Sequence, residues 1–170
     1  MLTEKMLNPN PHSLIIKKAS CAEPLQDLIE NISRIRKSDK KCVLQVFDPR
    51  AIATREHLIA SYIEAKISFS EKTARAGDPS MEMLLFAAMT RQISAAIKIA
   101  GAKNSEEFIL FTDSKPAFER LRSMLTSETE FNPSEKDALA VVRRLGIKVG
   151  RSTSLTNFLL ERIALSRLEQ

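Results

Sequence analysis

The fold is decided at residues 42–47, which read Cys42-Val43-Leu44-Gln45-Val46-Phe47. This stretch is short and almost continuously apolar, and Asp48-Pro49 ends it, so it predicts a strand buried inside a sheet. Leu14–Lys17 and Phe108–Phe111 have the same character and predict two further strands. Ile147 and Val149 would add a short fourth strand.

Helical patterns fill the intervals between these strands. Apolar residues recur with helical spacing from Leu25 to Ile35, and helix-starting residues precede five more segments. Those starting residues are Thr54, Asp78 with Pro79, Thr90, Ser114 with Pro116, and Ser134, and the last helix is expected at Leu155–Leu168. This order predicts an α+β fold, a single two-layer domain in which a small mixed sheet of three or four short strands is covered by about seven helices. A parallel sheet is also compatible with this order.

Length and composition are those of one globular domain. The chain has 170 residues, of which 44% are hydrophobic and 28% charged, and its net charge is +5. Residues 1–12 are expected to form a loose N-terminal extension and residues 13–170 the domain. The longest apolar run, Met83–Met89, is far shorter than the ~20 residues that span a bilayer, and no signal peptide is visible. We therefore expect a cytoplasmic protein with no membrane partner.

Motifs for nucleotide, metal or covalent chemistry are missing from the sequence. The chain has two histidines and four glycines, and it contains no CxxC, GxxxxGK or GxGxxG pattern. We therefore expect no cofactor, no metal and no enzymatic activity. Glu56 and His57 are the acid–base pair that a small enzyme would use, but a capping or packing role for His57 is the favoured interpretation.

Basic residues gather between residues 72 and 98. Arg91 and Lys98 are seven residues apart, which places them on one face of a helix, with Ile93, Ala96, Ile97 and Ala100 on the opposite face. Small residues between them would let a ligand backbone approach, and Gln92 offers both a donor and an acceptor. Such a face suits a phosphate backbone, although an ordinary solvated face has the same pattern. The candidate anion-binding residues are Lys72, Arg75, Arg91, Gln92 and Lys98.

A second basic cluster contains Arg143, Arg144, Lys148 and Arg151, with no acid between them. Its composition is compatible with nucleic acid, although a solvated loop after a helix is the favoured interpretation. Charge alone does not decide between the two interpretations.

The last expected helix is apolar on two sides. Leu155, Phe158, Leu159 and Ile163 can face the domain, whereas Leu160, Ala164 and Leu168 recur every four residues as a second stripe. Little chain follows to cover that stripe, which favours a partner interface. The candidate interface residues are Leu160, Ile163, Ala164 and Leu168, with Arg167 at the rim.

Several of these stretches together resemble a known family. Val43–Asp48, Arg55–Leu58, Met81–Phe86, Arg91–Ile97 and Leu159–Ala164 are similar, in this order and spacing, to the small kinase-binding regulatory subunit of the KEOPS (EKC) complex. One departure is Ala87-Ala88-Met89-Thr90, which stands where family members often carry a glycine.

The resemblance implies a function. A member would bind the small atypical kinase/ATPase subunit directly and the threonylcarbamoyl transferase subunit indirectly. It would hold tRNA by its single-stranded 3′ CCA end while the complex modifies the adenosine beside the anticodon. It would not itself be catalytic. The alternatives are a free-standing small enzyme with an acid/base site at Glu56 and His57, or a general RNA-binding module.

Overall fold

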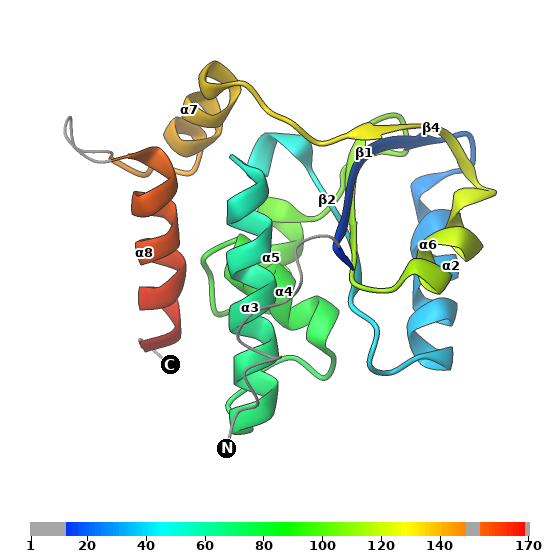
Figure 1. Cartoon of the computed structure of the whole chain (residues 1–170), viewed down its shortest axis with the longest axis horizontal. Coiled ribbons are helices and arrows are strands. Elements are labelled where there is room, and N and C mark those ends of the chain that lie inside the picture. Colours follow the sequence, from blue (N-terminus) through cyan, green and yellow to red (C-terminus); the bar gives the residue numbers. More distant parts are fainter. Residues whose placement is uncertain (1–12, 149–153, 169–170) are drawn as a thin grey trace.

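The structure is a computed structural model that describes residues 13–148 and 154–168, without the side chains of Arg167 and Leu168. Its centre is a four-stranded sheet with the order β2-β3-β1-β4 (Figure 1). The strands are β1 (Ile15–Cys21), β2 (Leu44–Phe47), β3 (Phe108–Thr112) and β4 (Leu125–Glu130). The expected extension at residues 1–12 lies outside the described residues.

All three strand pairings are antiparallel, not mixed as expected. Strands β1 and β2 run in the same direction, but β3 lies between them and is antiparallel to both. The helical connection between β1 and β2 is compatible with these strands as parallel neighbours. In the structure β3 lies between them, so they do not pair. The α+β class of the fold is confirmed.

Seven α-helices and one 3-10 helix surround this sheet within the described residues. They are α2 (Leu25–Ser38), α3 (Arg55–Glu71), α4 (Pro79–Ala87), α5 (Ile93–Ala100), α6 (Lys115–Arg122), α7 (Glu135–Arg144), α8 (Leu155–Leu168) and the 3-10 helix η2 (Pro49–Ala51). Several starts are as expected, because the side chains of Thr54, Asp78, Ser114 and Ser134 each accept a hydrogen bond from the first turn of the helix that follows.

Helices cover both faces of the sheet, so it lies between two helical layers and not beneath one. Alternate residues of β3 separate the two cores: Phe108 and Leu110 pack with α2 and α6, whereas Ile109 and Phe111 pack with α3 and α4. Figure 1 shows these two groups of helices on opposite sides of the strands. Every residue of β2 and of β3 is buried, as their apolar runs predicted.

The fourth strand is not where the sequence indicated. Ile147 lies in no strand, and Val149 lies outside the described residues. Strand β4 instead occupies a segment for which the sequence analysis predicts no strand. It is an edge strand paired only with β1, and Glu130 forms an ion pair with Lys17 across that pairing. Because its residues are mostly exposed, the strand carries no apolar run that sequence analysis could recognise.

Candidate functional site

Helix α8 lies at the surface against α3 and α4 (Figure 1). Leu159 and Ile163, four residues apart, are fully buried and anchor the helix to the domain. On the outer side, Leu160 is 37% exposed and Ala164 is also exposed. The result is an apolar stripe that the described residues leave uncovered, on a helix held firmly from the other side.

The structure divides the candidate interface residues of α8. Leu160 and Ala164 are on the surface, whereas Ile163 is in the core and supports the helix from beneath. Around the helix axis, Ile163 is turned by about 100° from Ala164 and by about 60° from Leu160, and its side chain is fully buried. Ile163 therefore does not present its side chain to a partner. The side chains of Arg167 and Leu168 lie outside the described residues.

The candidate anion-binding residues are also divided. Thr90 does not cap α5, because Gln92 occupies that position and the helix begins at Ile93. Arg91 therefore precedes the helix and cannot share a helical face with Lys98. Instead, Arg91 and Arg75 line the same small hollow, of about 30 Å³.

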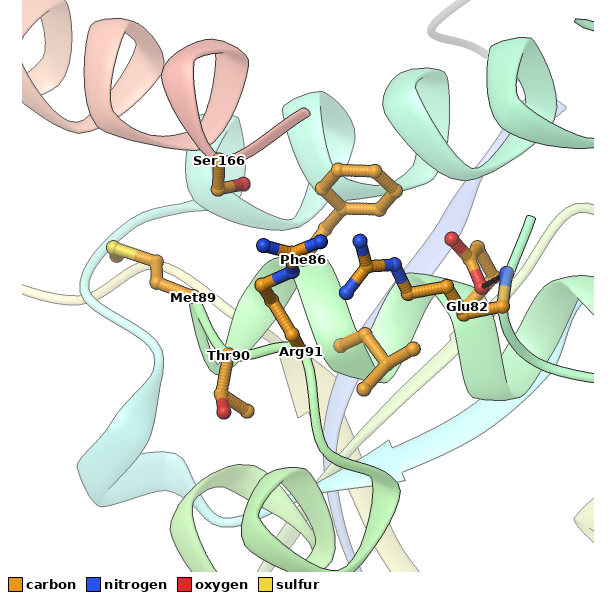
Figure 2. A pocket seen from close by; sticks show the side chains of 8 residues that line it. Glu82, Phe86, Met89, Thr90, Arg91 and Ser166 are labelled. Atoms are coloured by element: carbon orange, nitrogen blue, oxygen red, sulfur yellow. Dashed lines mark hydrogen bonds between the residues drawn. The ribbon is translucent and has the colours of Figure 1, made fainter. Parts of the chain in front are cut away.

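This hollow lies between α4 and α8. Figure 2 shows the Arg91 side chain pointing toward Phe86 of α4 and Ser166 of α8. Within the described part of the chain, neither Arg75 nor Arg91 forms an ion pair. Two arginines that form no ion pair outnumber the one buried carboxylate of the hollow, that of Glu82, and so leave it with a net positive charge that favours an anion.

Glu82 fixes one side of this hollow. Its side chain is almost completely buried, and Oε2 accepts hydrogen bonds from the backbone N–H groups of Arg75, at 3.0 Å, and Ala76, at 2.8 Å. These bonds hold the connection between α3 and α4 at the start of the hollow. Glu82 therefore positions the backbone that carries Arg75.

The remaining candidates lie outside this hollow. Lys72 is exposed at the end of α3, Gln92 is exposed at the start of α5, and Lys98 lines a separate groove. The prediction that one apolar face of α5 packs inward is correct for Ala96 and Ala100, which are buried. It is wrong for Ile93 and Ile97, whose side chains are 41% and 50% exposed. Gly101 allows the tight end of this helix, because an added Cβ would lie 2.7 Å from the Ile97 carbonyl oxygen.

His57 has a structural role between α3 and α4. Its Nδ1 accepts a hydrogen bond from the Ala53 N–H at 3.3 Å, and its Nε2 lies 3.0 Å from the Ala87 carbonyl oxygen, to which it donates. Burial lowers the pKa of His57 to about 4, so the ring is neutral at physiological pH. Both ring nitrogens are occupied while Glu56 is exposed, so the two do not form an acid/base site. The packing interpretation of His57 is confirmed.

Two general searches of the described residues complete the survey. No group of three or more potential ligands among His, Cys, Asp and Glu is placed to hold a metal ion there. None of the described helices combines the length and apolarity needed to cross a membrane.

Comparison with known protein families identifies the family of this chain. Residues 24–166 match the family described as kinase binding protein CGI-121. The chain belongs to this family. The match contains both Leu160 and Ala164, so the outer stripe of α8 is part of the CGI-121 region. Comparison with curated proteins gave no significant match. CGI-121 membership supports a kinase-binding role for this protein.

Proposed function

We propose that this protein is a non-catalytic regulatory subunit of the KEOPS complex. It binds the atypical kinase/ATPase subunit directly and the threonylcarbamoyl transferase indirectly, and it recruits tRNA by the 3′ CCA end in the cytoplasm. The adenosine beside the anticodon is then modified by the other subunits. The observation that carries the proposal is the uncovered apolar stripe on α8 in a member of a kinase-binding family.

The kinase interface is centred on Leu160 and Ala164. Because Leu159 and Ile163 anchor the opposite side of α8, a partner meets a surface that is already ordered. Burying two or three apolar side chains of this kind, at about 1.5–3 kcal/mol each, is enough to centre a small interface. Arg167 and Leu168 extend the proposed surface along the same helix.

The test of the kinase interface is a charge placed on the stripe. Ala164→Glu should weaken the affinity for the kinase about 100-fold, because docking would bury an unpaired carboxylate. The matched control is Ala140→Glu, which makes the same change at an exposed position of α7. Both affinities are measured by calorimetry and both variants by thermal unfolding. Equal kinase affinity for the two folded variants would exclude the stripe from the interface.

The tRNA interface is proposed at Lys72, Arg75, Arg91, Gln92 and Lys98. Support comes from Arg75 and Arg91, which line one hollow and form no ion pair within the described residues. Phosphate contacts from these cations would supply most of the affinity, while the Gln92 amide can read a base edge.

The test of the tRNA interface combines one protein change with one RNA change. Arg91→Glu and removal of the CCA end should each weaken binding strongly, and their effects should not add, because both remove the same contact. Full additivity would place Arg91 on another part of the tRNA. Kinase affinity should stay unchanged, which separates this site from the α8 stripe.

The proposal also requires that the isolated chain lacks activity. Purified protein should neither hydrolyse ATP nor form threonylcarbamoyl-AMP. Support comes from His57, whose ring nitrogens are both engaged by backbone groups. Turnover that disappears in the Glu56→Gln variant would favour the free-standing enzyme instead.

A further inference from the structure

The two edge strands of the sheet, β2 and β4, differ in how their outward backbone groups are satisfied. At the β2 edge, the Leu44 N–H donates to Ser80 Oγ at 3.1 Å, and the Leu44 carbonyl oxygen accepts from Arg36 Nε at 2.7 Å. The Val46 N–H donates to Gln45 Oε1 at 2.9 Å. Side chains of this chain therefore occupy the β2 edge and exclude a further strand from it.

Strand β4 forms the other edge, and its outward backbone groups are free within the described residues. The Phe131 N–H donates to the Ile16 carbonyl oxygen at 3.4 Å, so Phe131 faces β1. Because this facing alternates along an antiparallel pair, Thr129 also faces β1, whereas the backbone groups of Glu128 and Glu130 point away from the sheet. No N–H or carbonyl group among the described residues bonds to them from outside. Water or a further strand satisfies these groups.

Natural edge strands are usually protected against pairing by proline, by unpaired charge or by a bulge. Strand β4 contains no proline, and both of its glutamates are in ion pairs with cations of the described chain. A register shift in its pairing with β1 lies at its first residues, so the edge is regular from Ser127 to Glu130. This part of the strand is long enough to pair with a partner.

An acidic groove of about 600 Å³ adjoins the first residues of β4. Leu125 and Thr126 line it, together with the beginning of α2. Its charged lining residues are Glu23, Asp27, Glu30 and Arg34. Arg34 approaches Glu30 to 3.8 Å, whereas the other two acids form no ion pair within the described residues. A chain that continues past the first residues of β4 therefore meets negative charge that attracts a cation.

We propose that the free edge of β4 docks an extended segment of another protein, which pairs antiparallel with β4 and places lysine or arginine side chains in the acidic groove. Backbone hydrogen bonds at Glu128 and Glu130 give the affinity, and the groove selects a basic segment. Antiparallel pairing continues the pattern of the sheet. It also fixes the direction of the partner, whose basic residues follow its pairing residues, because the groove lies at the N-terminal end of β4.

Charge and geometry favour this occupant over three others. A docked helix would leave the outward groups of Glu128 and Glu130 unsatisfied. A second copy that paired through the same edge would bring its own Glu130 toward the acidic groove, where like charges repel. Residues 1–12 contain one glutamate, one lysine and two prolines, so they neither complement the groove nor suit a paired strand.

This surface is separate from those proposed for the kinase and for tRNA. Figure 1 shows α8 and β4 toward opposite ends of the long axis of the molecule. Changes on β4 should therefore leave the affinities for the kinase and for tRNA unchanged. The docking of a strand can be tested without assuming the proposed function.

The test uses the full chain and a fluorescein-labelled peptide, Thr-Val-Thr-Val-Thr-Lys-Lys, whose binding is measured by fluorescence anisotropy. Glutamate in place of both lysines should weaken binding at least about tenfold, and so should the reversed sequence. Methylation of the backbone nitrogens along one edge of the peptide should abolish binding, whereas methylation along the other edge should not, because only one edge pairs with β4. Equal binding of the two methylated peptides, or of the lysine and glutamate peptides, would overturn the proposal.

Variants of the protein test the same contacts from the other side. Glu128→Pro removes the outward N–H but no hydrogen bond to β1, and it should weaken peptide binding about tenfold. The matched control is Glu128→Ala, which loses the same carboxylate but keeps the N–H, and it should weaken binding less than about threefold. Equal effects of the two changes in folded protein would overturn the backbone pairing.

Glu23→Lys supplies a second variant, in the acidic groove, in case the proline disturbs folding. It should weaken peptide binding about tenfold by repelling the lysines. The matched control is Glu135→Lys, the same change at an exposed position in the first turn of α7, which does not line the groove. Equal affinities of these two folded variants would overturn the role of the groove.

Hydrogen exchange of the free protein distinguishes the occupants. The amides of Glu128 and Glu130 should exchange rapidly in the free chain and slowly with the peptide bound, whereas the Thr129 amide should be slow in both states. Slow exchange of Glu128 and Glu130 in the free chain at every concentration would show that this chain covers its own edge. Exchange that slows as protein concentration rises would show that a second copy covers it. Either result would overturn the proposal.

Discussion

Helices α4 and α8 are both largely apolar, yet of the two only α4 is enclosed by the described residues. In α4, Ser80 and every residue from Glu82 to Ala87 are buried. In α8, Leu159 and Ile163 are buried, but Leu160 and Leu165 are 37% and 40% exposed. The packing of the described residues therefore accounts for the composition of α4 but not for that of α8. An apolar helix surface that its own domain does not cover is explained by a partner.

The largest expected effect tests the enclosed helix. Met83 of α4 is fully buried, so Met83→Ala should lower the free energy of unfolding by about 3–4 kcal/mol through lost burial and a cavity. Leu160→Ala on α8 should cost less than about 1 kcal/mol, since its side chain already contacts solvent. Urea unfolding of both variants measures the difference. A similar loss of unfolding free energy in both variants would contradict the contrast between the helices, because Leu160 of α8 would then contribute to the core as Met83 of α4 does.

The pH dependence of stability tests the contact between α3 and the end of α4. His57 has an ordinary pKa of 6.5 when the chain is unfolded and a pKa of about 4 when it is buried against Ala87. Between pH 6.5 and pH 4, His57 therefore binds a proton in the unfolded chain but not in the folded chain. Stability from this group is complete above pH 6.5 and falls by about 3 kcal/mol as the pH drops toward 4.

Urea unfolding between pH 7 and pH 4.5 measures this loss. The control is His57→Gln, whose amide can still donate and accept but does not titrate. The variant is expected to be less stable at pH 7 and to have a flatter pH dependence. An unchanged pH dependence in the variant would show that other groups cause the acid loss.

For kinase affinity, the order of the two effects should be reversed, with the change on α8 larger than the change on α4. Leu160→Ala, which has little effect on folding, should weaken kinase affinity about tenfold, or about 1.4 kcal/mol, because Leu160 is the largest described side chain of the stripe. Met83→Ala should leave the affinity of the folded fraction unchanged. Calorimetric titration of both variants with the kinase measures this. A tenfold loss for Met83→Ala alone would mean that α4, not α8, carries the interface.

The same contrast explains which features the sequence could predict. Local signals were sufficient for α4, where Asp78 and Pro79 start an apolar run, and for the bounds of α8. Local signals also identified both stripes of α8 and placed Ile163 among the residues that can face the domain. Its inclusion among the candidate interface residues was wrong, because the packing of α8 buries its side chain completely. Strand β4 was missed because an exposed edge strand has no apolar pattern.

The candidate site needed information that only the folded chain contains. Arg91 was placed on α5 because Thr90 is a good capping residue, yet the helix begins after Gln92. A groove beside the hollow is lined by Arg50, Arg144 and Arg162, which come from elements far apart in the sequence. The one local signal was the basic cluster that contains Arg144, and charge alone gave no means of separating Arg144 from its neighbour Arg143.

The smallest expected effect concerns α3, the helix against which both α4 and α8 pack. Lys72 ends α3 with a φ of 60°, in the left-handed region where a side chain is unfavourable. Lys72→Gly removes that strain while keeping the backbone N–H that bonds to Phe69. The added freedom of glycine in the unfolded chain offsets part of the gain, so stability should rise by about 0.5–1 kcal/mol, or about 1–4 °C in Tm.

Lys72→Ala is the matched control for this last change. It removes the same charge but retains the strained backbone, so it should give no stabilisation. Both variants should lower tRNA affinity equally, by less than about threefold, because Lys72 is exposed and does not line the hollow of Arg75 and Arg91. A large, equal loss of tRNA binding would instead extend the RNA surface to the end of α3. Stabilisation by Gly but not by Ala would show that backbone geometry, and not charge, limits stability where α3 ends.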